Sequence, residues 1–218
     1  MTYDSANLAA DFFRYVKQLQ DFAGNEAHAL RLARALEIRV RVGRLNRVRM
    51  GYGTGAQIMV QPWWYGNSDV LRHEIAHVML WWSGLEAEII AEYGDELGWK
   101  VIENLCDYAV VLLKIPPPMV RDAVGRCGVS AQAVERLRRL SGAQPTQALH
   151  RLIYDDPGAQ RAGFLTNGHF IAEVAQCNWS LPFGWLDRVP EPVRKFPEGA
   201  KLSMLRLKPG QTLGVCWG

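Results

Sequence analysis

Two histidines four residues apart, His73 and His77, constrain this chain more than any other feature of its sequence. Residues at positions i and i+4 lie on one face of an α-helix, with Cβ atoms about 5–6 Å apart. The surrounding segment 67–83 has apolar residues at helical spacing, and it begins with Asn67 and Ser68, which are typical capping residues. We therefore predict a helix that presents both imidazoles on one side.

Glu74 directly follows the first of these histidines. The run His73-Glu74-Ile75-Ala76-His77 fits the H-E-x-x-H pattern, in which two histidines hold zinc and the glutamate is a general base. Two imidazoles on one helical face can reach one zinc ion at about 2.0–2.1 Å. Glu74 lies beside the first of them and can reach a water without binding the metal itself. The pattern predicts His73 and His77 as metal ligands and Glu74 as the catalytic base.

A catalytic zinc site needs a third protein ligand and an open position. The longer pattern H-E-x-x-H-x-x-G-x-x-H is excluded, since Leu80 stands at its glycine position and Ser83 at its third histidine. A carboxylate from a predicted helix over 95–114 is the alternative. We expect this apolar helix to be largely buried, so that its acids need a cation as partner. Its polar stripe consists of Glu96, Lys100, Glu103 and Asp107. Spacing alone leaves both Glu103 and Glu96 open as the third ligand.

The remaining elements follow from periodicity and from turn residues. Apolar spacing predicts further helices over 6–22, 25–36, 118–126, 130–141 and 145–153, and a break near Gly94. Alternation predicts short strands over 38–42, 48–50 and 58–60. Asn167-Gly168 and Pro209-Gly210, each between apolar runs, predict two hairpins near the C-terminus.

Together these elements predict an α+β fold in three parts. Residues 1–116 form a core of helices with a small three-stranded sheet. Residues 117–155 form a short helical module, and residues 156–218 form a small β-rich region.

The positive charge of the chain is concentrated in one segment. The net charge is only +3, yet seven arginines fall between positions 31 and 49, where Glu37 is the one acid. They are Arg31, Arg34, Arg39, Arg41, Arg44, Arg47 and Arg49. Such a cluster can attract nucleic acid or an acidic protein surface. Because Arg39 and Arg41 alternate with apolar residues, our favoured interpretation is the solvated outer face of a strand.

The N-terminus has no basic segment, and no apolar run approaches the roughly 20 residues that cross a bilayer. We therefore expect a cytoplasmic protein with no membrane contact. The four cysteines lie far apart without C-x-x-C spacing, so we expect reduced structural thiols.

Two segments carry a resemblance to a known family. The first is Arg72-His73-Glu74-Ile75-Ala76-His77, and the second is Glu103-Asn104-Leu105-Cys106-Asp107-Tyr108-Ala109-Val110-Val111-Leu112-Leu113-Lys114-Ile115-Pro116. With both, the chain resembles the ImmA/IrrE family of zinc metallopeptidases over roughly its first 150 residues. The resemblance implies a zincin-like core and selects Glu103 rather than Glu96 as the third metal ligand. Asp107 is expected to orient a ligand imidazole.

The resemblance also implies a cofactor and a partner. The cofactor is zinc, with manganese as the alternative metal in the cell, and the substrate is a helix-turn-helix repressor of the XRE type. Its limited cleavage would derepress stress-response or mobile-element genes. The segment 117–155 is similar to a helix-turn-helix-like region, for which we expect a packing role beside the peptidase core. DNA contact is the less favoured alternative.

Three further expectations concern the reaction. A peptide substrate would pair with an edge strand, for which we predict Gln57 to Gln61. No oxyanion donor can be named from the sequence. Candidates by chemistry alone are Tyr65, Tyr93, His150 and His169, and for each of them the favoured interpretation is a structural or exposed side chain. Two other classes of function remain open: a non-catalytic metal-binding regulator that acts on protein or DNA, and an antitoxin-like component that acts through protein binding.

Overall fold

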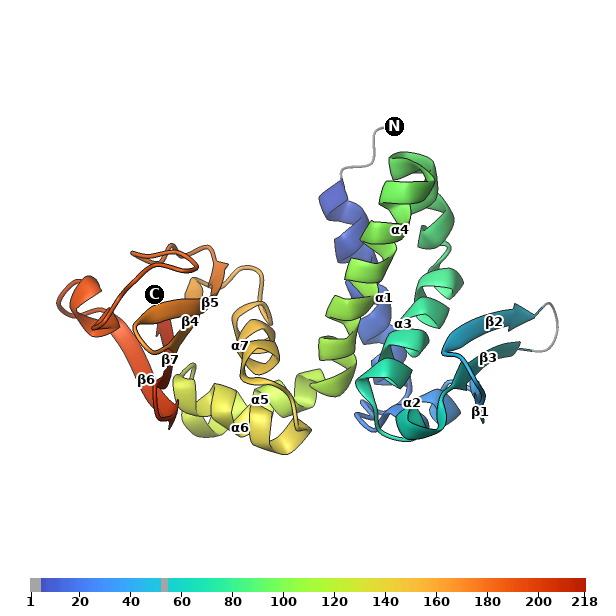
Figure 1. The fold of residues 1–218 in the computed structure, drawn as a ribbon, viewed down its shortest axis with the longest axis horizontal. Helices are drawn as coiled ribbons and strands as arrows, with labels where there is room; N and C mark the ends of the chain where they lie inside the picture. The colour runs from blue at the N-terminus through green and yellow to red at the C-terminus, as the bar shows by residue number, and fades with distance from the viewer. Residues whose placement is uncertain (1–4, 52–54) are drawn as a thin grey trace. The chain divides into compact units, whose positions relative to one another are not determined.

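The computed structural model describes residues 5–51 and 55–218 and divides the chain into two compact units, Met1–Pro116 and Pro117–Gly218 (Figure 1). Both units combine helices with a small sheet, so the predicted α+β fold class is confirmed. The segments 117–155 and 156–218, which we expected as separate parts, lie together in the second unit.

The first unit contains four α-helices and three strands among its described residues. The helices are α1 (Ser5–Phe22), α2 (Ala29–Ala35), α3 (Asp69–Ser83) and α4 (Leu85–Lys114). The strands are β1 (Arg39–Val42), β2 (Arg47–Gly51) and β3 (Gly55–Val60), and a 3-10 turn, η1 (Pro62–Trp64), follows β3. The helix α2 begins later than position 25, because Asn25 has the left-handed backbone angle φ of 59° and cannot start it.

The three-stranded sheet has the order β1-β3-β2. The strand β3 pairs in parallel with β1 and in antiparallel with β2. The prediction that Gln57 to Gln61 form a free edge strand is therefore wrong, since both edges of β3 are hydrogen-bonded. The free edges belong to β1 and β2.

The core of the first unit lies between the helices and one face of this sheet. Buried apolar residues come from α1, α2, α3 and α4 and from the inward positions Ala56, Ile58 and Val60 of β3. Gly94, with φ of 72° and ψ of 169°, interrupts α4 as predicted. The expectation that the following part of α4 is largely buried is wrong, since Leu97, Trp99 and Tyr108 are each about half exposed. The helices α1 and α3 pack against α4 and cover only part of its surface.

The second unit contains three helices and a four-stranded antiparallel sheet. The helices are α5 (Pro117–Cys127), α6 (Ala131–Ser141) and α7 (Pro145–Ile153), and a 3-10 turn, η2 (Pro192–Lys195), lies near the end of the chain. The strands are β4 (Arg161–Asn167), β5 (Phe170–Cys177), β6 (Lys201–Lys208) and β7 (Gln211–Trp217), in the order β5-β4-β7-β6. Both predicted hairpins are confirmed, as β4–β5 and β6–β7.

The helices of the second unit pack against its own sheet: α6 contacts β6, and α7 contacts β4 and β5. The packing partner of the helix-turn-helix-like segment is thus the C-terminal sheet. A second small core contains the rings of Phe164, Phe183 and Phe196. The four cysteines are free thiols. Among the described helices of both units, none is long and apolar enough to span a bilayer.

Candidate metal centre

The helix α3 carries the two histidines, and its ends are fixed by local interactions. The Ser68 hydroxyl accepts a hydrogen bond from the Leu71 backbone N–H at 3.1 Å and caps the N-terminus. Gly84, with φ of 78°, ends the helix in the left-handed conformation that glycine adopts most easily. The buried residues of α3 lie on its core side and leave the imidazoles of His73 and His77 only partly covered.

A network of charged groups joins the start of α3 to the end of α4. The guanidinium of Arg72, almost fully buried, pairs with Asp69 at 2.9 Å and donates to the carbonyl oxygen of Ala27 at 2.7 Å. Asp69 also accepts from Lys114 Nζ at 2.8 Å. The Asp69–Lys114 pair joins the two helices at one end of their interface, and His73 lies opposite Asp107 further along it. Sequence reasoning missed this network; the available signal was Lys114, a lone cation in an apolar stretch.

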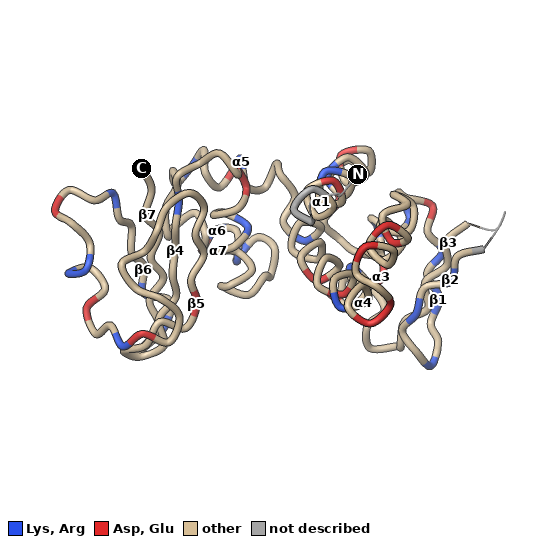
Figure 2. Tube along the Cα trace, turned by 90° about the horizontal axis from the view of Figure 1, so that it is seen from above, with Lys and Arg blue, Asp and Glu red and all other residues tan. Residues whose placement is uncertain are grey.

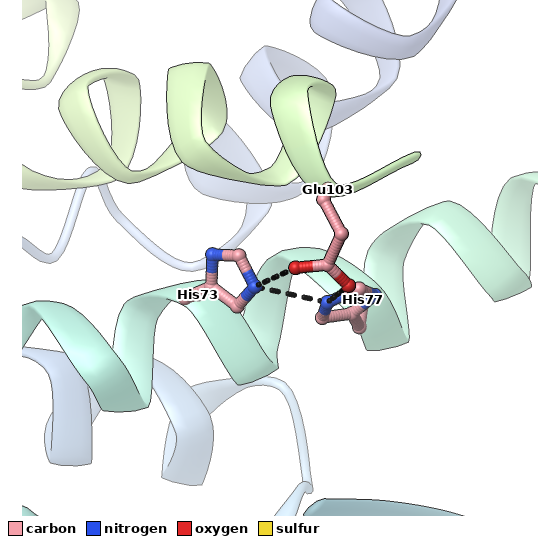
Figure 3. A group of neighbouring side chains, drawn as sticks. All are labelled: His73, His77 and Glu103. Atoms are coloured by element: carbon pink, nitrogen blue, oxygen red, sulfur yellow. Dashed lines mark hydrogen bonds and ion pairs between the residues drawn. The ribbon is translucent and has the colours of Figure 1, made fainter. Parts of the chain in front are cut away.

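Glu103 on α4 faces both histidines of α3 (Figure 3). Its Oε2 lies 3.2 Å from His73 Nε2, and its Oε1 lies 3.4 Å from His77 Nε2. The two Nε2 atoms are 3.0 Å apart. One donor atom from each of the three residues therefore lies within 4.8 Å of the other two.

These distances fit the coordination of one zinc ion. Donor atoms at about 2.0–2.1 Å from a tetrahedral zinc are about 3.3 Å from one another. The two Nε2 atoms are 3.0 Å apart, and each lies near that edge length from a different oxygen of Glu103, His73 at 3.2 Å from Oε2 and His77 at 3.4 Å from Oε1. Two nitrogens and one carboxylate also form a typical set of protein ligands for catalytic zinc, which leaves a fourth position open. The three side chains thus form a donor set that suits a metal ion.

Asp107 lies one helical turn beyond Glu103 and contacts the other ring nitrogen of His73. Its Oδ1 is 2.9 Å from His73 Nδ1. A carboxylate at Nδ1 holds the proton on that nitrogen and leaves Nε2, which faces Glu103, with its lone pair free. Asp107 therefore lies where an orienting residue would act.

The carboxylate of Glu74 is half-buried beside this group. Burial raises the pKa of Glu74 above its ordinary value, with a further increase from the Glu103 charge and a partial decrease from His73. No hydrogen bond or ion pair occupies the Glu74 carboxylate within residues 5–51 and 55–218. The group is thus free to take up a proton, and its affinity for one is increased.

The imidazole of His77 is also perturbed. Burial lowers the pKa of His77, and the neighbouring His73 lowers it further, whereas Glu103 and Asp107 oppose the shift. A lowered pKa favours the neutral imidazole, which is the form that binds a metal ion.

Glu96, the rival third ligand, lies outside this group. Its carboxylate pairs with Lys100 at 2.8 Å and is 89% exposed, while the Glu103 carboxylate is 55% exposed. The premise that the acidic stripe is buried was wrong, although Glu103 does face the histidines.

The four suggested oxyanion donors are placed elsewhere. Tyr93 packs against the apolar core of the first unit, and Tyr65 lines a separate pocket. His150 faces Glu173 within the second unit, where His169 is exposed. Within the described part of the chain, none of the four has a hydrogen bond to His73, His77 or Glu103. The structure gives no reason to assign any of them to the site.

Comparison of the sequence with protein-family models and with curated proteins finds no match.

Proposed function

We propose that this protein is a zinc-dependent endopeptidase of the ImmA/IrrE type. Its metal ligands would be His73, His77 and Glu103, its general base would be Glu74, and Asp107 would orient His73. The observation that carries the proposal is the meeting of His73, His77 and Glu103, with one donor atom of each within 4.8 Å of the other two. Glu74 lies next to His73 in the sequence, and its carboxylate has no hydrogen bond or ion pair within the described residues. Metal binding alone gives no reason for a half-buried carboxylate without a partner.

Bound zinc would polarise the scissile carbonyl and make an attacking water more acidic. Glu74 takes the proton from that water and later returns it to the leaving amine. Its raised pKa suits both tasks, because a base whose pKa lies nearer to neutral pH takes up and releases a proton more easily. Asp107 keeps the proton of His73 on Nδ1, so that Nε2 remains available as a ligand.

The proposed substrate is a helix-turn-helix repressor of the XRE type in the cytoplasm, cut at a limited number of positions. This part of the proposal rests on the resemblance of the two motifs to the ImmA/IrrE family. Its consequence would be derepression of stress-response or mobile-element genes.

The test measures zinc content and cleavage together. Wild type, Glu74→Gln, Glu103→Gln and Glu96→Gln would be purified as full chains and reconstituted with zinc. Each would then be incubated with the XRE-type repressors encoded in the same genome. We expect wild type and Glu96→Gln to bind one zinc and cut one repressor. Glu74→Gln should bind zinc but cut about 10²–10⁴-fold more slowly.

Glu96→Gln is the matched control for Glu103→Gln, because it makes the same change on the same helix but outside the triad of His73, His77 and Glu103. Loss of zinc in Glu103→Gln alone supports the ligand assignment. If wild type binds zinc and cuts none of the repressors, the metal-binding regulator becomes the better proposal. If Glu74→Gln cuts as fast as wild type, Glu74 is not the base.

A further inference from the structure

The outer face of the three-stranded sheet carries four arginines in two rows. In the first row Arg39, Gln57 and Arg49 are direct partners across β1, β3 and β2. In the second row the partners are Arg41, Met59 and Arg47. Direct partners share a face of a sheet, and residues two apart along a strand share it too. All four arginines therefore lie on the face opposite the buried Ala56, Ile58 and Val60.

This arginine face, defined by Arg39, Arg41, Arg47 and Arg49, has no acidic partner. All four side chains are exposed, and within residues 5–51 and 55–218 none of them makes an ion pair or a side-chain hydrogen bond. Figure 2 shows basic positions on these strands and acidic positions along α3 and α4. From position 27 to position 67 of the sequence, Glu37 is the one acid.

In the second unit, several arginines are paired with acidic side chains. Arg126 and Arg136 both contact Asp122, and Arg138 and Arg139 both contact Glu135. On the arginine face, by contrast, the Cα atoms of the four arginines lie at the corners of a rectangle of about 6.6 Å by 9.6 Å, the spacing of alternate residues and of alternate strands. Their mutual repulsion is reduced when an anionic partner with closely spaced charges binds.

An aromatic side chain lies next to one corner of this face. Tyr65, 46% exposed, lines a pocket of about 270 Å³ together with Arg39 of β1 and Arg34 of α2. Glu37 also lines it. The pocket is smaller than the roughly 300–1,000 Å³ of sites that enclose a whole small molecule. Leu30, Ile38 and Val40 complete its lining, so the pocket lies beside β1 and α2, and its size suits a single planar group next to Tyr65.

We propose that the arginine face binds a single-stranded nucleic acid, with phosphates along the two arginine rows and one base against Tyr65. Repeated phosphates match four unpaired guanidinium groups. Proteins that bind single strands without sequence preference combine such a positive surface with aromatic rings on which bases stack. An acidic polypeptide would use the arginines but would gain nothing from the exposed phenol ring. This proposal is independent of the peptidase activity.

The test measures binding of a fluorescein-labelled 20-residue oligothymidylate to the full-length protein by anisotropy at several salt concentrations. Four phosphate contacts predict a slope of about −2.8 for the logarithm of the binding constant against the logarithm of salt concentration. Arg39→Gln/Arg49→Gln should reduce the slope to about −1.4 and weaken binding by about 10-fold or more. Tyr65→Leu should weaken binding by about 5-fold or more without changing the slope.

The matched control is Arg121→Gln/Arg206→Gln, which removes the same charge from exposed positions of the second unit and should bind as wild type does. Circular dichroism would check that each variant is folded. Equal loss of binding in both double variants would show a non-specific charge effect and overturn the proposal. It is also overturned if wild type does not bind the oligonucleotide, if wild type binds duplex DNA as tightly as the single strand, or if polyglutamate competes at equal charge.

Discussion

The two units of this protein hold their charged side chains in different ways. In the first unit, the pKa of Glu74 is raised and that of His77 is lowered, and in both cases burial is the largest cause. In the second unit, the pKa of Asp122 and that of Glu135 are both lowered, chiefly by hydrogen bonds from arginines. Glu74 and His77 thus lie in an environment that disfavours their charged forms, whereas Asp122 and Glu135 lie in one that favours theirs.

This difference distinguishes a candidate functional site from a surface whose ion pairs stabilise the fold. A buried titratable group without a matching partner lowers the free energy of unfolding, so it needs another reason to be present. The exposed acid–arginine clusters of α5 and α6 need no such reason, because each charge already has its partner. From this contrast we predict that a substitution in the second unit does not alter the zinc affinity of the first unit. A substitution in the first unit should likewise leave the acid–arginine pairs of the second unit unaltered.

The largest expected effect is on the core of the second unit. Phe164→Ala removes a fully buried ring that packs against Phe183 and Phe196, and it should lower the free energy of unfolding by about 3–5 kcal/mol. Zinc affinity should not change, because the triad lies entirely in the first unit. Denaturant unfolding and a zinc titration with a competing chelator measure the two quantities. The control is Phe22→Ala, whose ring is 79% exposed. A fall in zinc affinity with Phe164→Ala would show that the units are coupled.

A smaller effect is expected from Asp107→Asn in the first unit. Loss of the carboxylate at His73 Nδ1 should weaken zinc binding about 10- to 100-fold, or about 1.4–2.7 kcal/mol. The same chelator competition measures it. Asp95→Asn, on α4 outside the triad, is the matched control and should bind zinc as wild type does. Equal affinities for both variants would remove the orienting role from Asp107.

The smallest effects concern pH, and they have opposite signs in the two units. The pKa of Glu74 is raised, so its contribution to stability is present below its ordinary value of 4.5 and lost as the pH rises through the raised value. Metal-free Glu74→Gln should therefore have a higher melting temperature than wild type at pH 7, and the difference should shrink towards pH 4.

The opposite holds for Asp122. Its pKa is lowered, so its contribution is present above the ordinary value of 3.8 and lost as the pH falls through the lowered value. Asp122→Asn should have a slightly lower melting temperature than wild type at pH 7, with no difference in strong acid. Calorimetry on the metal-free protein measures both variants. Shifts of the same sign would contradict the distinction between the two groups.

Much of the local structure could be predicted because its causes are local. The i and i+4 spacing of His73 and His77 requires a helix if both are to reach one ion, and Ser68 and Gly84 fix the ends of that helix. Asn167-Gly168 and Pro209-Gly210 supply the turns of the two hairpins. In each case the determining interactions connect residues within a few positions of one another.

The errors came from interactions between distant segments. Whether β3 is an edge or a central strand depends on which strands pair with it, and β1 does so in parallel from well upstream in the chain. The exposure of α4 depends on how much of its surface α1 and α3 cover, which no periodicity records. The contact of α6 with β6 likewise joins segments that are far apart in the sequence.

The sequence by itself determined the fold class, the helix that carries His73, Glu74 and His77, and the pair of acids that were candidates for the proposed third ligand. Only the tertiary structure decided between that pair on physical grounds: the packing of α3 against α4 brings Glu103, rather than Glu96, opposite the histidines. It also gathered four arginines on one face of the sheet. Both outcomes depend on pairing between segments, and that pairing is a property of the folded chain as a whole.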